Sequence, residues 1–424
     1  MKYSVKDIKL APQGQKNITW AENQMGALIE VQQEFKKTKP LKNIAIGMAL
    51  HVTKETAVLV RTLKHAGAQV AIASCNPLSS QDDVAAALAK EGVAVFAHKG
   101  ESKKEYYQNI KSVINFMKDM AQKKMKLITI DDGCDLVFEI HTRHRELLKY
   151  IIGGAEETTT GIIRLKSMEK EKALQYPVIA VNDSKTKHLM DNYIGTGQST
   201  IDGILRATNT LFAGKVVVII GFGNCGKGVA RRASGLGANV IVTEVDPFCA
   251  LQAIMEGYRV MPLNQAAKIG DIFITLTGNI HVIDAPHMKI MKDGAILANS
   301  GHFDVEINVN GLEKISNRKE FIRPYLDKYT TGKKSLYLVA QGRLCNLAAA
   351  EGHPSTIMAM SFCNQFFACK YLVDNQNKLE NKVYLLPDEF DEKISKLQLK
   401  ALDIKIDKLT QEQIKYLNSW QQGT

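Results

Sequence analysis

The segment VVVIIGFGNCGKGVARRASGLGANVIVTEVD, residues 216–246, constrains the fold of this chain more than any other. An apolar strand pattern runs directly into Gly221, Gly223 and Gly226, and a helical pattern follows. Such a turn bends tightly, lets a pyrophosphate approach the backbone, and packs the helix closely on the strand. The next strand ends at Glu244, where a carboxylate favours the free ribose hydroxyl of NAD over the phosphate of NADP. The pattern therefore predicts a Rossmann-type domain that binds NAD.

About half of the 424 residues precede this turn, so the length favours at least one further domain. Short apolar segments alternate with amphipathic ones along the chain, which is typical of a doubly wound parallel sheet. Predicted strands of the first half cover 43–50, 68–74, 93–98, 126–132 and 177–182, with helices at 54–67 and 81–92. Predicted strands of the second half cover 216–221, 239–246, 272–278 and 295–301, with a helix at 199–214 and a last strand and exit within 335–354.

We therefore expect an α/β protein with two doubly wound parallel-sheet, Rossmann-like domains, a cleft between them, and a short C-terminal arm. The predicted bounds are 1–182 plus 354–395 for a substrate-binding domain, 183–353 for the NAD-binding domain, and 396–424 for the arm. The apolar helix 358–374 is expected to return to the first domain, and the amphipathic tail 393–420 to pack or to contact another subunit. Chain crossings near 183–198 and 350–356 predict a hinge that closes the cleft.

The net charge of +11 does not by itself indicate a nucleic-acid-binding protein, because 55 basic residues are interspersed with 44 acidic ones. No apolar run of 18 residues and no secretory leader pattern is present, so we expect a soluble, cytoplasmic protein without membrane contact. Seven scattered cysteines without a Cys-x-x-Cys pair predict neither a disulfide framework nor a metal site. His141 and His144 have a His-x-x-His spacing, which we interpret as part of a solvated helix face.

Polar side chains gather where several predicted strands end. They are His51, Thr53, Glu55 and Thr56; Asp131 and Asp132; Glu156, Glu157, Thr158, Thr159 and Thr160; and Lys187, Asp191 and Asn192. Each group has an ordinary structural interpretation, because Asp and Thr cap helices and a run of threonines suits a turn. Ligands nevertheless bind at the carboxyl ends of parallel strands. Four groups at comparable positions therefore predict one cleft that faces the dinucleotide domain.

The segments HVTKETAVL, SCNPLSSQDDVAAALA, DDGCDL, EETTTG, NDSKTKHLMDN, GFGNCGKG, TEVDP, SGHFDVEI and NLAAAEGHPS resemble, in this order, the S-adenosyl-L-homocysteine hydrolase family. The resemblance extends from about residue 5 to residue 420. It implies reversible hydrolysis of S-adenosylhomocysteine to adenosine and homocysteine by a homotetramer. It also implies that tightly held NAD oxidises the ribose 3′-hydroxyl, which makes the C4′ hydrogen acidic and allows elimination. Water then adds and the ketone is reduced, so NAD ends each turnover unchanged.

The resemblance also implies roles for individual residues. Lys187 and Asp191 would act at the 3′-hydroxyl, and Lys187 would need a depressed pKa or a shared proton to act as a base. Asp132 would be the base at C4′, and His51 and His302 would handle protons on sulfur and water. Glu157 would hold ribose hydroxyls, while Thr53, Glu55, Thr56, His353, Met358 and Phe362 would bind the rest of the substrate. The cofactor would contact Thr158, Thr159, Thr160, Asn192, Gly221, Gly223, Asn224, Cys225, Gly226, Lys227, Gly228, Glu244, Cys249, Thr277, Ser300, Gly301, His302 and Asn346.

Several positions depart from the family pattern. Thr196 and Cys249 stand where the family commonly has Cys and Asn, Asn224 stands where Asp is common, and Glu351 replaces an apolar residue. The chain ends at NSWQQGT without the basic, tyrosine-containing tail of many members, so it resembles a shorter form. These departures predict a cofactor that is held less tightly.

Three other functions remain open from the sequence. Glu351 beside the expected base site allows a preference for S-inosyl-L-homocysteine, whereas Thr53, Glu55 and His353 favour adenine. A net NAD-dependent dehydrogenase would share the two-domain layout, but the DDGCDL and NDSKTKHLMDN segments argue against it. A catalytically dead, adenosine-binding relative is disfavoured because every expected proton-handling residue is present.

Overall fold

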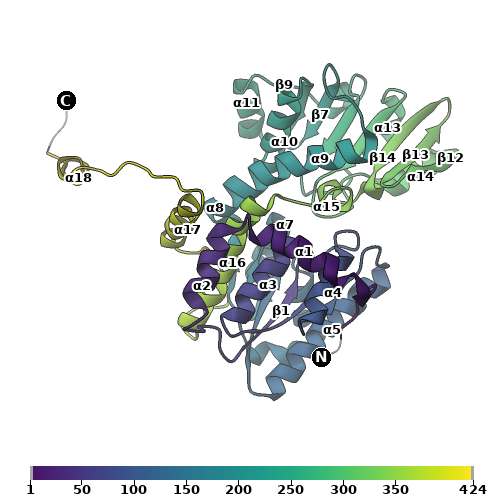
Figure 1. Cartoon of the computed structure of the whole chain (residues 1–424). Coiled ribbons are helices and arrows are strands. Elements are labelled where there is room, and N and C mark those ends of the chain that lie inside the picture. The colour runs from purple at the N-terminus through teal and green to yellow at the C-terminus, as the bar shows by residue number, and fades with distance from the viewer. Residues whose placement is uncertain (1–2, 422–424) are drawn as a thin grey trace.

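The computed structural model describes residues 3–421, whose strands form two separate sheets (Figure 1). The first sheet has seven parallel strands in the order β15-β6-β5-β4-β1-β2-β3. Its strands are β1 (Ile44–Ala49), β2 (Gln69–Ala73), β3 (Ala94–Phe96), β4 (Lys126–Asp131), β5 (Ile151–Glu156), β6 (Val178–Ala180) and β15 (Val383–Tyr384). Strand β15 joins this sheet about 200 positions after β6, so segments that are far apart in the sequence form one body. This sheet and its helices are the first body of the molecule, and the other sheet with its helices is the second.

Both faces of the first sheet are buried, because a doubly wound sheet carries helices on each side. Ile44, Ile46 and Met48 of β1 belong to the core formed with α1, α2, α3, α4 and α16, whereas Ala45 and Ala49 belong to the core formed with α5, α6 and α7. These helices are α1 (Ala11–Glu22), α2 (Gly26–Phe35), α3 (Lys54–His65), α4 (Asp82–Lys90), α5 (Lys103–Gln122), α6 (Asp135–Arg143), α7 (Thr159–Lys170) and α16 (Ser355–Asp374). The short turns η1 (Ile8–Leu10) and η2 (Arg145–Tyr150) complete this part.

The second sheet has eight strands in the order β12-β13-β14-β11-β10-β7-β8-β9. Its strands are β7 (Val216–Ile220), β8 (Asn239–Thr243), β9 (Arg259–Val260), β10 (Ile272–Thr275), β11 (Ala295–Asn299), β12 (Arg318–Arg323), β13 (Leu326–Thr331) and β14 (Lys334–Val339). The α/β Rossmann-like fold predicted from the sequence is confirmed. The sheet is not entirely parallel, however, since β12 and β13 form an antiparallel extension beside β14. Strand β12 is charged and mostly exposed at the edge of the sheet, and β13 mixes buried with polar residues, so neither has the apolar pattern that predicted the other strands.

The second sheet is covered by α9 (Thr196–Thr208), α10 (Asn224–Gly235), α11 (Pro247–Met255), α12 (Leu263–Ala266), α13 (Ala285–Ile290), α14 (Val309–Ile315) and α15 (Cys345–Ala348). The predicted helix 199–214 is wrong at both ends, because α9 begins at Thr196 and stops where Asn209 adopts a left-handed backbone with φ of 52°. The chain reaches α9 through η3 (Val181–Asp183), α8 (Lys185–Lys187) and the π-helical turn η4 (His188–Gly195). After β14 come η5 (Ala340–Gly342) and α15, and the chain then returns to the first sheet between α15 and α16. We propose that these two crossings, near 183–198 and 350–356, are the hinge.

The C-terminal region consists of α17 (Asp388–Ala401), an irregular stretch, and α18 (Gln411–Leu417). Helix α17 packs on α2, where Lys393 and Lys400 pair with Glu34 and Glu30 at 2.9 and 2.8 Å. Figure 1 shows α18 far from both sheets, and this helix buries none of its residues. Among residues 3–421, no helix combines the length and hydrophobicity needed to cross a membrane.

Candidate active site

A cavity of about 1030 Å³ takes its walls from both bodies of the molecule. The strand ends of the first sheet contribute one wall, and the glycine turn after β7 contributes another. All the residues to which the family resemblance gives a role line this cavity except Gly226, Lys227 and Gly228. The cavity therefore joins the polar groups that the sequence placed at strand ends with the dinucleotide turn.

One buried cluster surrounds the ammonium group of Lys187. Its Nζ lies 2.7 Å from Asp191 and 3.7 Å from Glu157, and it donates to Asn192 Oδ1 at 2.8 Å. Asp191 also contacts the ring of His353, which lies in the second crossing. The π-helical turn η4 supplies Asp191 and Asn192, and such turns are frequent at functional sites. The carboxylate of Asp191 thus links Lys187 of the first crossing to His353 of the second.

The protonation states of this cluster follow from burial and charge. Burial alone would lower the pKa of Lys187, but the carboxylates of Asp191 and Glu157 raise it well above its ordinary value. The depressed lysine pKa required for a simple base is therefore absent, and a proton shared with Asp191 is the arrangement that the geometry supports. Burial raises the pKa of Glu157 to about 7, against the opposing effect of Lys187.

A second cluster consists of His51, Asp132 and His302. The carboxylate of Asp132 lies 3.3 Å from His51 Nε2 and 3.6 Å from His302 Nδ1. His51 follows β1 and Asp132 follows β4, whereas His302 comes from the loop after β11 in the second sheet. Burial lowers the pKa of His51 to about 4, so its ring is neutral at pH 7. One carboxylate between two imidazoles from different bodies can accept and pass on protons.

Asp131 and Glu156 occupy neighbouring strand ends but do not line the cavity. Asp131 accepts backbone hydrogen bonds from Asp132 and Val137, and Glu156 accepts them from Gly133 and Thr158. Burial raises the pKa of Glu156 well above its ordinary value. Through these hydrogen bonds the two acids fix the loops that carry Asp132 and Glu157. Their role is therefore structural, since neither side chain faces the cavity.

The part of the cavity lined by Glu55, Met358 and Phe362 is bounded by an ionic bridge. Lys54 lies 3.3 Å from Glu55 and 2.8 Å from Glu351, and Glu351 in turn lies 3.6 Å from Arg206 of α9. Glu55 accepts a hydrogen bond from Ser355 at 2.6 Å. Thr53, in addition to lining the cavity, caps α3 through Thr56. Glu351, one of the residues that depart from the family pattern, thus connects the two bodies at the edge of the cavity.

The glycine turn has the form that a pyrophosphate requires. Gly221 has φ of 100°, a conformation that favours glycine. A side chain on Gly223 would meet no atom, whereas one on Gly226 or Gly228 would overlap the backbone carbonyl of Gly221 or Tyr193. Gly223 faces the cavity and the other two are packing positions, which explains why Gly226 and Gly228 do not line it. Lys227 instead lies over the ring of Phe222.

The remaining residues expected at the cofactor also fit NAD. Glu244 follows β8 at the cavity wall, and Asn224 and Cys225 begin α10, whose N-terminus favours an anion. Thr158, Thr159, Thr160, Asn192, Cys249, Thr277, Ser300, Gly301 and His302 line the same cavity. Asn346 is buried, and its Oδ1 has no hydrogen-bond partner within the described part of the chain. An unpaired amide oxygen is costly, so a donor such as the carboxamide of nicotinamide fits it.

The difference between Gly223, which faces the cavity, and Gly228, which is a packing position, can be tested directly. We expect Gly228→Ala to lower the free energy of unfolding by about 1–3 kcal/mol, because the new methyl overlaps a backbone carbonyl. Gly223→Ala should unfold at the wild-type temperature yet bind NAD more weakly, since its methyl occupies the space that the pyrophosphate approaches. Thermal unfolding without cofactor and a fluorescence titration with NAD measure the two effects. Equal effects of both variants on stability would contradict this division of roles.

The interpretation of His141 as a solvated side chain is wrong. His141 is buried, its Nδ1 lies 2.8 Å from the carbonyl oxygen of Val137, and its Nε2 accepts a hydrogen bond from the backbone of Gln175. His144 is half-buried beside Lys118. The spacing gave no sign of burial because the groups that cover His141 come from another part of the chain.

Several residues that support the site were not predicted. Ser361 and Gln365 of α16 donate hydrogen bonds to Glu157, and Asn182 accepts one from Lys187. Glu306 is buried and accepts hydrogen bonds from the backbone and hydroxyl of Thr277. Ser361 and Gln365 are polar side chains within the largely buried helix α16, and this was the sequence signal that could have revealed these supporting residues.

Comparison with known proteins places these features in context. Residues 2–147 match the family model described as S-adenosyl-L-homocysteine hydrolase, and residues 192–352 match its NAD binding domain. The chain is 56% identical to the adenosylhomocysteinase of Sulfurisphaera tokodaii, with both chains covered completely. It is 54% identical to the S-inosyl-L-homocysteine hydrolase of Methanocaldococcus jannaschii, also with complete coverage of both chains. The adenosylhomocysteinase of Aquifex aeolicus is 53% identical over the same extent.

Proposed function

Because this chain belongs to the S-adenosyl-L-homocysteine hydrolase family, we propose that it reversibly hydrolyses S-adenosyl-L-homocysteine to adenosine and L-homocysteine. It is an NAD-dependent hydrolase by its family and its NAD-binding domain. One observation carries the assignment of substrate chemistry. Two proton-handling clusters, around Lys187 and around Asp132, line the same cavity as the dinucleotide turn.

Bound NAD supplies a reversible oxidation at a ribose hydroxyl, and the protein positions the acids and bases around it. The Lys187–Asp191 pair is suited to the 3′-hydroxyl, because a shared proton can move between substrate, ammonium and carboxylate. Glu157 lies beside this pair and is suited to hold a neighbouring hydroxyl. Because Lys187 and Asp191 share a proton across 2.7 Å, Lys187 does not have to be a neutral amine for the pair to accept the proton of the hydroxyl.

Asp132 is suited to remove the C4′ proton, since its carboxylate lies between two imidazoles that can relay protons. His51, neutral at pH 7, can take a proton from water, and His302 is suited to protonate the leaving sulfur. His302 is attached to the second body, so closure of the cavity adjusts its distance from Asp132. Closure would also exclude water while the sugar is oxidised.

A specific observation also favours S-inosyl-L-homocysteine as a second candidate substrate. Glu351 carries a charge at the cavity edge, and the relative from Methanocaldococcus jannaschii has that name. The carboxylate of Glu55 supports adenine, because adenine offers an exocyclic amine donor where hypoxanthine offers an acceptor. The thioethers of adenosine and of inosine can therefore be compared as substrates in a single assay.

The cellular location and the assembly follow from the same proposal. All seven cysteines are free thiols, which supports a reducing cytoplasm. The exposed apolar side chains of the arm, including Leu402, Ile406 and Trp420, support the homotetramer expected from the family.

The experiment uses purified protein with NAD and, separately, the adenosyl and the inosyl thioether. Free thiol and reduced nicotinamide are followed together. We expect thiol release from S-adenosyl-L-homocysteine, slower release from the inosyl compound, and no net accumulation of reduced nicotinamide. Release from the inosyl compound alone would establish the second candidate. Reduced nicotinamide accumulating in step with turnover would mean a net dehydrogenase, and no thiol from either compound would mean a binding protein.

A further inference from the structure

One carboxylate in the wall of the cavity lies beside a lysine that does not reach the cavity. Glu55 lines the cavity, and its side chain is only 2% exposed. The ammonium group of Lys54 lies 3.3 Å from Glu55 Oε1, and the hydroxyl of Ser355 donates to the same oxygen at 2.6 Å. Both contacts fall on Oε1, which leaves Oε2 to accept a hydrogen bond from a molecule in the cavity.

The side chain of Lys54 is held from its other side by Glu351. Lys54 is buried, and its ammonium donates to Oε2 of the exposed Glu351 at 2.8 Å. The backbone N–H of Lys54 donates to Gln81 Oε1 at 2.9 Å, so both ends of the residue are fixed. Burial alone would lower the pKa of Lys54, but the carboxylates of Glu55 and Glu351 raise it above its ordinary value. Lys54 therefore remains a cation beside Glu55.

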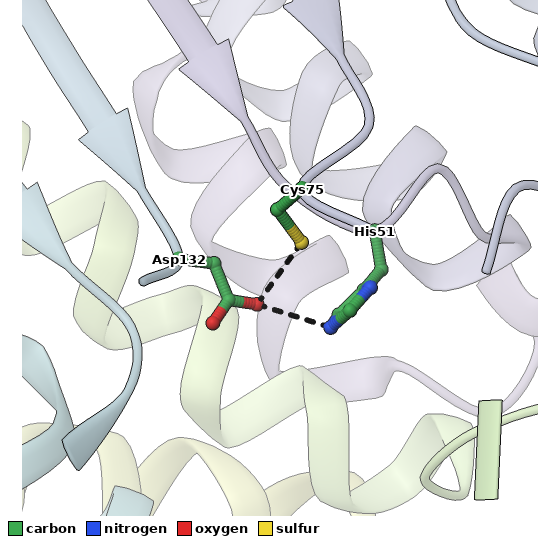
Figure 2. A group of neighbouring side chains, drawn as sticks. All are labelled: His51, Cys75 and Asp132. Carbon is green, nitrogen blue, oxygen red and sulfur yellow. Dashed lines mark hydrogen bonds and ion pairs between the residues drawn. The ribbon is translucent and has the colours of Figure 1, made fainter. Parts of the chain in front are cut away.

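The neighbours of Glu55 differ from those of Asp132, another carboxylate that lines the cavity. Figure 2 shows Asp132 Oδ2 between the ring of His51, at 3.3 Å, and the thiol of Cys75, which donates to it at 3.6 Å. Neither neighbour is charged at pH 7, because burial lowers the pKa of His51 to about 4 and raises that of Cys75. Neutral neighbours suit a base, which changes its charge during turnover, whereas the ammonium of Lys54 suits a carboxylate that stays charged.

A carboxylate that stays charged distinguishes adenine from hypoxanthine at the exocyclic position. An ionised carboxyl group only accepts hydrogen bonds, which suits the exocyclic amine of adenine. A protonated carboxyl group also donates one, which suits the exocyclic oxygen of hypoxanthine. A buried charge is costly without a partner of opposite charge, so removal of the ammonium group favours the protonated form of Glu55.

We propose that Lys54 is a positioning residue that selects adenine by keeping Glu55 ionised, and that Glu351 holds its ammonium group in place. This inference rests on the proposed function, because it places the purine in the part of the cavity that Glu55 lines. It also gives Glu351 a role, since the charge of this residue is directed to Lys54 and not to the base. The alternative is that the pair Lys54–Glu55 only stabilises the start of α3.

The test compares thiol release from the adenosyl and the inosyl thioether as a ratio of kcat/KM within each variant, so that partial unfolding cancels. We expect Lys54→Met to lower the preference for the adenosyl compound by about 10- to 100-fold, and Lys54→Arg to retain most of it. Lys64→Met is the matched control, since Lys64 lies on the same helix and donates to the carbonyl oxygen of Glu91 at 3.1 Å. An unchanged ratio in Lys54→Met, or an equal loss in Lys54→Arg, would overturn the proposal.

The role of Glu351 is tested in two backgrounds. Glu351→Met should lower the preference for the adenosyl compound less than Lys54→Met does, because Glu55 keeps its cation. In a protein that already carries Lys54→Met, the same substitution should have no further effect. An equal effect in both backgrounds would show that Glu351 acts on the base without Lys54, which contradicts its proposed role.

Binding supplies a measurement that needs no turnover. The probes are 3′-deoxyadenosine and 3′-deoxyinosine, which lack the hydroxyl assigned to oxidation by NAD, and calorimetric titration of the holoenzyme gives their affinities. We expect Lys54→Met to lower the ratio of these affinities in the same direction as the ratio of kcat/KM. Such a change in a protein that releases no thiol would refute the proposed function but keep the role of Lys54. Turnover of the adenosyl compound with both ratios unchanged in Lys54→Met would refute only the role of Lys54.

Discussion

Asp132→Asn is expected to lower steady-state thiol release by about 10²- to 10⁴-fold while leaving the fold intact. The amide has nearly the same shape as the carboxylate but cannot accept the C4′ proton. Its neighbours His51 and His302 keep a polar partner at 3.3 and 3.6 Å. The pair Lys187–Asp191, which is assigned to the 3′-hydroxyl, remains unchanged. Mixing this variant with substrate should therefore still reduce the bound nicotinamide in the first turnover.

The measurement follows nicotinamide absorbance and free thiol in one stopped-flow experiment. Asp135→Asn is the matched control, because Asp135 lies three residues later, pairs with Arg164 at 2.7 Å and does not line the cavity. The control should release thiol at a rate close to that of the wild type. If Asp132→Asn also did so, Asp132 would not be the base. If it failed to reduce nicotinamide, its carboxylate would be needed earlier than the assigned step.

Lys187→Met is expected to remove both activity and stability. The substitution leaves Asp191 and Glu157 buried without their cation, and loss of one partner from such a cluster costs about 3–5 kcal/mol. Without the shared proton at the 3′-hydroxyl, reduction of nicotinamide should also slow by about 10²-fold or more. Lys185→Met is the control, since Lys185 is exposed and pairs with Asp388 at 3.0 Å.

The stability loss in Lys187→Met should depend on pH in a defined direction. Burial already raises the pKa of Glu157 to about 7 in the presence of Lys187, and removing the ammonium raises it further. The folded variant then binds a proton that the unfolded chain has released, so its stability falls as pH rises from about 5 to 8. Denaturant unfolding at pH 5.5 and 8 should show the larger deficit at pH 8. A deficit that grows towards low pH would contradict the arrangement of charges around Lys187.

The strands that the sequence revealed best are those buried on both faces. In β1 and β7 every residue is apolar except Gly47, and in β4 the apolar residues Leu127, Ile128 and Ile130 are buried, because helices cover both sides of each sheet. Strand β5 was missed because its sequence IIGGAE contains two glycines, which have low strand propensity. The structure shows the reason for them. A side chain on Gly153 would overlap Leu372 of α16, and one on Gly154 would overlap Thr129 of β4.

The pKa values of the site residues were harder to predict from the sequence. The family resemblance predicted that Lys187 and Asp191 would lie together at the 3′-hydroxyl. Whether the pKa of Lys187 falls or rises depended on how far the carboxylates of Asp191 and Glu157 outweigh burial, and Glu157 comes from a distant part of the chain, after β5. The proximity of Cys75 to Asp132 was equally hidden, because the two residues are 57 positions apart and follow strands separated by β1.

The sequence by itself determined the α/β class and the NAD turn, because these depend on local periodicity and on a motif with short spacing. Its resemblance to a known family named more than half of the residues that line the cavity. Only the tertiary structure decided which polar groups share a proton, which glycines are packing positions, and that Glu351 connects the two bodies through Lys54 and Arg206. The physical reason is that pKa values and steric fit depend on neighbours within a few ångströms, and the fold brings those neighbours from distant parts of the chain.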